Sequence, residues 1–249
     1  AGPAMDVEIL TALFDDYVRA ARILGVDAVF ATAVDSMKRR FPPLQVGKNG
    51  ELQEWLNDWV SIEPQHRHLS HLWGLYPGDE ILPHGTPEIA TAARRSLIAR
   101  GEGGCGWSIA WKMALWARLG DGERAYASFR TLMSNNVFPD LFSRCGQAMQ
   151  VDGNFGAAAG IGEMLLQSQT GEIVLLPALP NEWSNGHVNG LRARGGFELD
   201  VEWKGGALRK VVIRSLNGNA CTVRYSGRSV RFDTKSGESY TLDGELKKS

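Results

Sequence analysis

The hydrophobic period changes once along the 249-residue chain, near residue 170. Before that point apolar residues recur at three- and four-residue steps, as at Leu10, Leu13 and Phe14, which is typical of amphipathic helices. Beyond Gly171, short segments alternate apolar and polar residues between turn signals, which is typical of antiparallel strands. The sequence therefore predicts an α+β multidomain chain, with a helical part at 1–170 and a β domain at 171–249.

Helices are predicted at five places in the first part, separated by short connections that favour an antiparallel helical array. They cover residues 5–25, 86–101, 106–122, 121–136 and 152–168. Between the first two lies a loop-rich stretch, 41–86, and a loop of that length usually carries function. The first helix begins almost at residue 1, so we expect the chain to start inside a domain.

Strands are predicted in six segments of the second part, each bounded by turn residues. They cover residues 172–179, 186–203, 208–216, 220–227, 229–234 and 238–244.

Charge and composition exclude several classes of partner. The net charge is -1 without a block of like charge, which argues against nucleic acid. The sequence contains no run of eighteen apolar residues, so we expect no membrane partner. No signal peptide is visible either. The localisation stays open, and a longer parent protein could be secreted or periplasmic. Three cysteines are too few for a disulfide framework and leave at least one free thiol. The 8 Trp and 29 Gly suit flat polar ligands such as sugars.

Histidines gather in "EPQHRHLSHLWGLYPG", which contains His66, Arg67, His68 and His71. Such spacings can hold zinc, yet no cysteine pair or HExxH pattern accompanies them, so no metal or other cofactor is expected. Two alternatives remain for this segment. Arg67 and a neighbouring histidine recognise hydroxyl or carboxylate groups, or the segment is a purely structural loop.

Carboxylates stand beside tryptophans in "GELQEWLND", where Glu54 is a candidate acid because an apolar setting raises a carboxyl pKa. The alternative is an ordinary element with its acids outward. In "RGEGGCGWSIAWK" no phosphate-binding glycine pattern is present, and we expect the turn to deliver Trp107 into a cleft. In "QVDGNFGAAAG", Asp152 is either a helix N-cap or a carboxylate at a cleft mouth, with Asn154 as its polar neighbour.

These strings, together with "GEIVLLPALP" and "GLRARGGFELDVEW", resemble the C-terminal part of family 95 glycoside hydrolases, α-L-fucosidases with some α-L-galactosidases. The resemblance spans roughly residues 3–225. It implies later helices of an (α/α)6 barrel followed by a C-terminal antiparallel β-sandwich, and hydrolysis with inversion. It also implies a fucosylated or related oligosaccharide as substrate and an N-terminal barrel segment of the same protein as a structural partner.

The resemblance assigns roles to single residues. Asp152 matches the family's general base, Arg67 and His68 match residues that bind the sugar's hydroxyls, and Trp107 and Asn154 lie on matching loops. The family's asparagine pair and its general-acid glutamate have no counterpart here and are expected before residue 1, with Glu54 as the fallback acid.

One departure affects specificity. Gly146 stands where the family commonly has a sugar-contacting histidine, which leaves the choice between fucose and L-galactose open. The expected function is therefore part of an inverting exo-glycosidase, and the alternative is a non-catalytic carbohydrate-binding or structural fragment that needs a partner segment.

Overall fold

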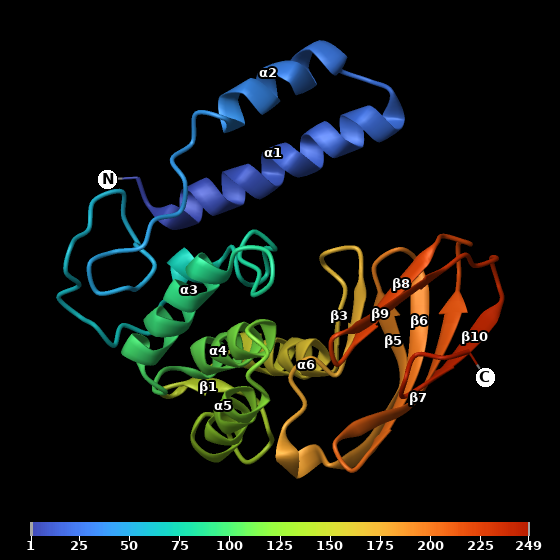
Figure 1. Ribbon diagram of the computed structural model, residues 1–249. Coiled ribbons are helices and arrows are strands. Elements are labelled where there is room, and N and C mark those ends of the chain that lie inside the picture. The colour runs from blue at the N-terminus through green and yellow to red at the C-terminus, as the bar shows by residue number, and fades with distance from the viewer. Residues whose placement is uncertain (1, 249) are drawn as a thin grey trace. The chain divides into compact units, whose positions relative to one another are not determined.

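The computed structural model describes residues 2–248 and contains a helical region followed by a domain rich in antiparallel sheet, in the expected order (Figure 1). The chain forms two compact units, which meet in sequence between Gly104 and Cys105. Helices α4, α5 and α6 belong to the same unit as the sheets, so this division does not coincide with the change from helices to strands. Within the described residues, no helix combines the length and apolar character needed to span a membrane.

The first unit begins with two helices that lie side by side in Figure 1. Its elements are α1 (Ala4–Leu24), α2 (Ala28–Lys38), a 3-10 turn η1 (Ser70–Leu72) and α3 (Pro87–Arg100). Helix α1 ends at Gly25, whose φ of 69° is left-handed, as the glycine stop predicted. Helix α2 was not predicted. Ring contacts between Tyr17 and Phe30, and between Phe14 and Phe41, join α1 to α2 and the segment that follows it.

The stretch 41–86 carries little regular structure, as predicted, but it has its own buried side chains. Leu69, Leu72, Leu75 and Ile81 are at most 1% exposed, and η1 lies among them. This apolar anchor fixes the end of the stretch that follows the histidine cluster.

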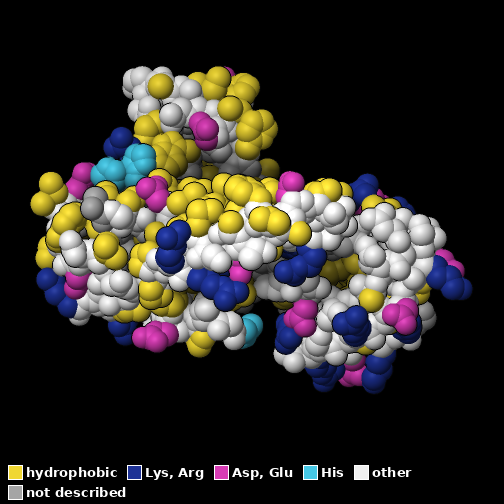
Figure 2. All heavy atoms as spheres, turned by 90° about the horizontal axis from the view of Figure 1, so that it is seen from above, with side chains coloured by type: hydrophobic (Ala, Val, Ile, Leu, Met, Phe, Trp, Pro, Cys, Tyr) yellow, Lys and Arg dark blue, Asp and Glu magenta, His cyan; other side chains and the backbone are white. Residues whose placement is uncertain are grey.

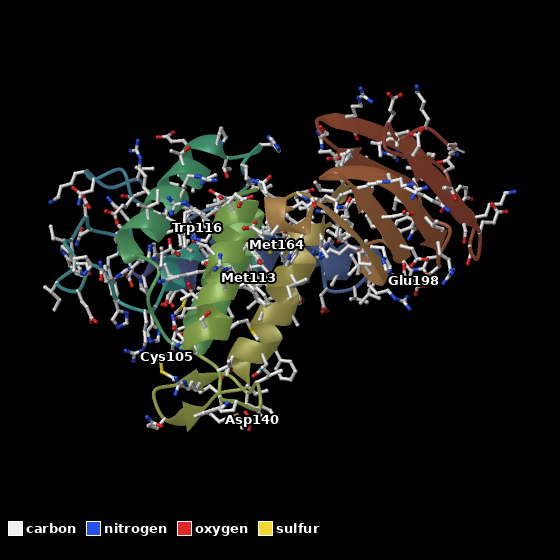
Figure 3. The ribbon with its side chains drawn as sticks, turned by 90° about the horizontal axis from the view of Figure 1, so that it is seen from below. Cys105, Met113, Trp116, Asp140, Met164 and Glu198 are labelled. Carbon is white, nitrogen blue, oxygen red and sulfur yellow. A yellow bond between two sulfur atoms is a disulfide. The ribbon has the colours of Figure 1, made fainter. Side chains whose placement is uncertain are left out.

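Three helices of the second unit pack closely: α4 (Gly106–Arg118), α5 (Gly122–Asn135) and α6 (Asp152–Leu165). Glycines on α6 allow close approach, because a Cβ at Gly160 would lie 2.9 Å from the side chain of Met113. Figure 3 shows Met113 and Met164 between α4 and α6. Helix α6 is not buried on all sides, since Phe155 on its outer face is 71% exposed.

The strands form a hairpin and two four-stranded sheets. Their bounds are β1 (Arg144–Cys145), β2 (Ala148–Met149), β3 (Leu166–Gln167), β4 (Ile173–Leu175), β5 (Asn185–Ala193), β6 (Phe197–Lys204), β7 (Ala207–Ser215), β8 (Cys221–Tyr225), β9 (Arg228–Phe232) and β10 (Ser239–Asp243). A second 3-10 turn, η2 (Asn181–Trp183), precedes β5. One sheet has the order β10-β7-β6-β5 and the other β3-β4-β8-β9.

Both four-stranded sheets contribute to one hydrophobic core. Val211 and Ile213 of β7 and Val223 of β8 are fully buried in it. The strand β6 alternates buried and partly exposed residues along its length, as the period of two predicted. The antiparallel prediction needs one correction, because β4 pairs with β8 in parallel, with Ile173 opposite Val223. Each of the six segments predicted to be strands contains at least one.

Candidate active site

Asp152 is the first residue of α6 and its side chain is exposed. Its place in the first turn puts the carboxylate beside the backbone N–H groups that begin the helix and have no partner within it. The residue follows the segment 141–151, which contains the β1–β2 hairpin and is called here, with Asp152 itself, the Asp152 loop. An exposed carboxylate on such a loop is placed where it could accept a proton from a bound water.

Asn154 uses both ends of its amide to hold the Asp152 loop. Its Oδ1 accepts a hydrogen bond of 2.8 Å from the backbone N–H of Ser143, and its Nδ2 donates one of 2.9 Å to the carbonyl of Leu141. The sequence suggested Asn154 as a residue of the cleft. Its contacts in the structure are those of a clamp on the backbone.

Trp107 lies in the first turn of α4 and is half-buried. The starts of α4 and α6 are adjacent, since a Cβ at Gly153 would lie 3.0 Å from the backbone carbon of Gly106 and 2.5 Å from Ser143 Oγ. The lack of a side chain at Gly153 thus allows Trp107 and Asp152 to sit on neighbouring helix starts.

Arg67 and His68 are exposed, on the loop that precedes η1. The rings of His66 and His68 stack with their centroids 4.8 Å apart, and His66 Nδ1 accepts a 3.2 Å hydrogen bond from the backbone N–H of His68. Partial burial, and then the neighbouring His66 and Arg67, lower the pKa of His68. A neutral imidazole both donates and accepts hydrogen bonds, which suits hydroxyl groups.

His71 has a different environment from the other two histidines of the cluster. It is 3% exposed, and burial followed by the nearby Arg100 lowers its pKa to about 3. The imidazole therefore stays neutral inside the apolar anchor. In the part of the chain that the structure describes, no group of three His, Cys, Asp or Glu side chains is arranged to hold a metal ion.

Glu54 is ion-paired. Its Oε2 lies 2.7 Å from Nη2 of Arg100, whose side chain is buried at the end of α3. Arg100 also donates to the carbonyl of Glu63 at 3.3 Å. The Glu54 carboxylate is thus already engaged by a side chain of the protein, whereas a general acid must present its carboxyl group to the leaving oxygen.

A hollow of about 140 Å³ opens beside this ion pair. Its lining includes Glu54, Asp58, Trp59, His71 and Arg100. The aromatic face of Trp59, which is 59% exposed, and the surrounding polar groups form the mixed lining typical of a sugar site.

Comparison with family models decides the family. Residues 1–165 match the glycosyl hydrolase family 95 catalytic domain, and residues 167–243 match the glycoside hydrolase family 95 C-terminal domain. The chain belongs to glycoside hydrolase family 95. This is the family that the sequence motifs suggested.

Family 95 relatives cover nearly the whole chain. Alpha-L-fucosidase 2 of Arabidopsis thaliana is 39% identical over 98% of this chain and 30% of its own length. Two proteins named probable alpha-fucosidase A are also similar. That of Aspergillus oryzae is 30% identical over 88% of this chain and 35% of its own length. That of Aspergillus niger is 31% identical over 79% of this chain and 27% of its own length. The chain thus spans about a third of the length of these relatives.

The site residues expected from family 95 fall into two sets. Glu54, Arg67 and His68 lie on the loop stretch 41–86 of the first compact unit, and the second unit carries Trp107, Asp152 and Asn154. The sequence analysis did not identify the ion pair of Arg100, because an arginine in the last turn of a helix, before a glycine, is typical of an ordinary helix end. It also missed the hydrogen bonds that clamp the Asp152 loop.

Proposed function

We propose that this chain is the C-terminal portion of an inverting exo-glycosidase that releases terminal α-L-fucose or L-galactose from glycans. Residues 1–170 would be the later helices of an (α/α)6 barrel and 171–249 a β-sandwich. The observation that carries the proposal is Asp152, an exposed carboxylate at the start of α6 on a loop clamped by Asn154. The fucosidase names of the family 95 relatives support the sugar class.

In the proposed reaction, the Asp152 carboxylate takes a proton from a water while that water attacks the anomeric carbon. A carboxylic acid protonates the leaving oxygen on the opposite face of the sugar, about 6.5–9.5 Å from the base, so that the water fits between. The ion pair of Glu54 with Arg100 favours an acid supplied by another segment of the whole protein.

Arg67 and His68 would bind the sugar's hydroxyls in this proposal. The guanidinium offers several donors in a fixed plane, and the neutral imidazole of His68 can accept as well as donate. Both side chains are exposed and are held on one short segment by the His66–His68 stack.

The test is hydrolysis of an aryl α-L-fucoside by an active preparation of the protein and its Asp152→Asn variant. Loss of a general base costs about 10²–10⁴-fold, so the variant should keep less than about a tenth of the activity. Asp140→Asn is the matched control, because Asp140 is an exposed carboxylate near the same hairpin whose Oδ1 caps the N–H of Phe142. Equal losses in both variants would refute the assignment of Asp152.

A second measurement addresses the acid. Purified chain 1–249 should be inactive or nearly so, and robust turnover by it would place the acid within these residues, with Glu54 as the first candidate. Calorimetry with L-fucose separates a binding module from an enzyme, since binding without turnover in any preparation would favour the module.

A further inference from the structure

The Asp152 loop is covalently tied to the start of α4. Cys105 and Cys145 form a disulfide between residues 40 positions apart in the sequence, with a Cα–Cα distance of 4.6 Å. Cys105 immediately precedes α4, and Cys145 is the last residue of β1. Figure 3 shows the sulfur–sulfur bond beside the hairpin, close to the labelled Cys105. Cys221, in contrast, is a buried free thiol.

Hydrogen bonds continue from Cys145 toward Asp152. The hairpin pairs Cys145 with Ala148, and beyond it the N–H of Gln150 donates to the carbonyl of Ser143 at 2.9 Å. The hydroxyl of Ser143 donates in return to the carbonyl of Gln150. The disulfide is thus connected to Asp152 through a few consecutive, hydrogen-bonded residues.

Burial contributes little to holding this loop. Leu141, Phe142, Met149 and Val151 are 39–59% exposed, and β1 and β2 are two residues long. A short two-stranded hairpin is at best marginally stable by itself. Two backbone hydrogen bonds also tie its first strand to the segment after α5, from the N–H of Phe138 to the carbonyl of Phe142 and from the N–H of Arg144 to the carbonyl of Asn136. The position of the loop against the starts of α4 and α6 depends in addition on the disulfide and on the Asn154 clamp.

We propose that the Cys105–Cys145 disulfide is a positioning element for Asp152, so that the protein reaches full activity with this bond formed. The proposal rests on the proposed role of Asp152 as base. Displacing a reacting group by about 1 Å can cost about 10²-fold in rate, so a loosened loop would lower kcat. Arg67 and His68 lie in the other compact unit, so KM would change little.

The test compares an active preparation with its Cys105→Ser/Cys145→Ser double variant and with protein treated with dithiothreitol. The reagent closes to its own cyclic disulfide and transfers two electrons and two protons, which leaves two thiols in the protein. Two readouts are needed: amide hydrogen exchange across 141–155, and kcat and KM for an aryl α-L-fucoside.

We expect faster exchange across 141–155 and a kcat at least about tenfold lower, with KM within about threefold, in both the variant and the reduced protein. Dithiothreitol should not change the double variant, which controls for effects on Cys221. Circular dichroism confirms that the variant is folded. Unchanged exchange, or faster exchange at unchanged kcat, would overturn the proposal. If the oxidised protein does not hydrolyse the fucoside, the proposed function fails, while exchange still decides whether the disulfide holds the loop.

Discussion

The guanidinium of Arg100 donates to the carboxylate of Glu54 across 2.7 Å, and so joins the end of α3 to the loop stretch 41–86. The Arg100 side chain is 8% exposed and that of Glu54 is 32% exposed. A second contact, to the carbonyl of Glu63, extends the connection toward the histidine cluster. One buried cation therefore holds two points of the loop stretch, both shortly before Arg67 and His68.

Replacing Arg100 by methionine should destabilise the protein by about 2–3 kcal/mol. Breaking a buried pair costs about 3–5 kcal/mol, and the partial exposure of Glu54 reduces that figure. Urea unfolding measures the loss, and the double variant Glu54→Gln/Arg100→Met should recover part of it. The exposed Arg67→Met serves as the control and should change stability by less than about 0.5 kcal/mol. An equal loss of stability in Arg100→Met and Arg67→Met would contradict a special role for Arg100.

Stability should depend on pH through two buried groups of the first unit. Glu8 is fully buried on α1, and burial raises its pKa to about 8; the nearby amides of Gly74 and Trp73 offset only part of that rise. Between pH 4.5 and 8 the folded state holds a proton that the unfolded state releases, so Glu8 makes stability fall as pH rises. His71, with its pKa lowered to about 3, acts in the opposite direction up to pH 6.5.

These opposing slopes cancel between pH 4.5 and 6.5, and above pH 6.5 we expect a loss of about 1.4 kcal/mol per pH unit up to pH 8. Burial also raises the pKa of Glu80, which acts in the same direction as Glu8. Urea unfolding between pH 6.5 and 8 should show a shallower slope for Glu8→Gln, whereas exposed Glu88→Gln should keep the wild-type slope. Parallel curves for all three proteins would show that Glu8 does not retain its proton.

Two glycines of α6 should respond oppositely to alanine. A Cβ at Gly153 would meet Ser143 Oγ at 2.5 Å, next to Asp152, whereas a Cβ at Gly162 meets no atom within 4 Å. Gly162→Ala should stabilise the protein by about 0.5–1 kcal/mol, because alanine is the better helix former, and leave activity unchanged. Gly153→Ala should lower both the melting temperature and kcat. A neutral Gly153→Ala would mean that the start of α6 is not closely packed.

Apolar side chains on α1 and α2 form an exposed surface. In the view from above, hydrophobic atoms gather on the side that these helices present (Figure 2). Ile23 is 77% exposed and Val29 is 88% exposed. Chain 1–249 should therefore bind a hydrophobic dye, and Ile23→Lys/Val29→Lys should reduce the dye's fluorescence while changing stability by less than about 0.5 kcal/mol per site. Ile98→Lys, at an exposed residue of α3, is the control.

Periodicity predicted five of the six α-helices found in residues 2–248 and the six strand segments, because long amphipathic patterns reflect burial directly. Helix α2 was missed although Asp27 stands at its N-cap position; in the structure Asp27 has a left-handed φ of 53° and its side chain makes no capping hydrogen bond. The parallel pairing of β4 with β8 was missed as well, because alternation within a strand does not specify its neighbour.

The roles of Asp152, Arg67 and His68 stay predictions from the sequence motifs. The motifs do not show which contacts hold these residues in place. The bond between Cys105 and Cys145 joins residues distant in sequence, and an odd number of cysteines does not show which two pair. The departure at Gly146 has a local cause visible in the structure alone: the residue turns the β1–β2 hairpin with a φ of 60°, where a histidine would be strained.

The parallel pair of β4 and β8 has a consequence for the order of folding. All of β5, β6 and β7 lie between the two strands in sequence, and these three can join as successive hairpins. Ile173 meets Val223 after a long loop has closed, at an entropic cost that neighbouring strands do not face. The sheet β3-β4-β8-β9 should therefore be completed last, and a chain cut before β8 would leave β4 paired with the two-residue strand β3 alone.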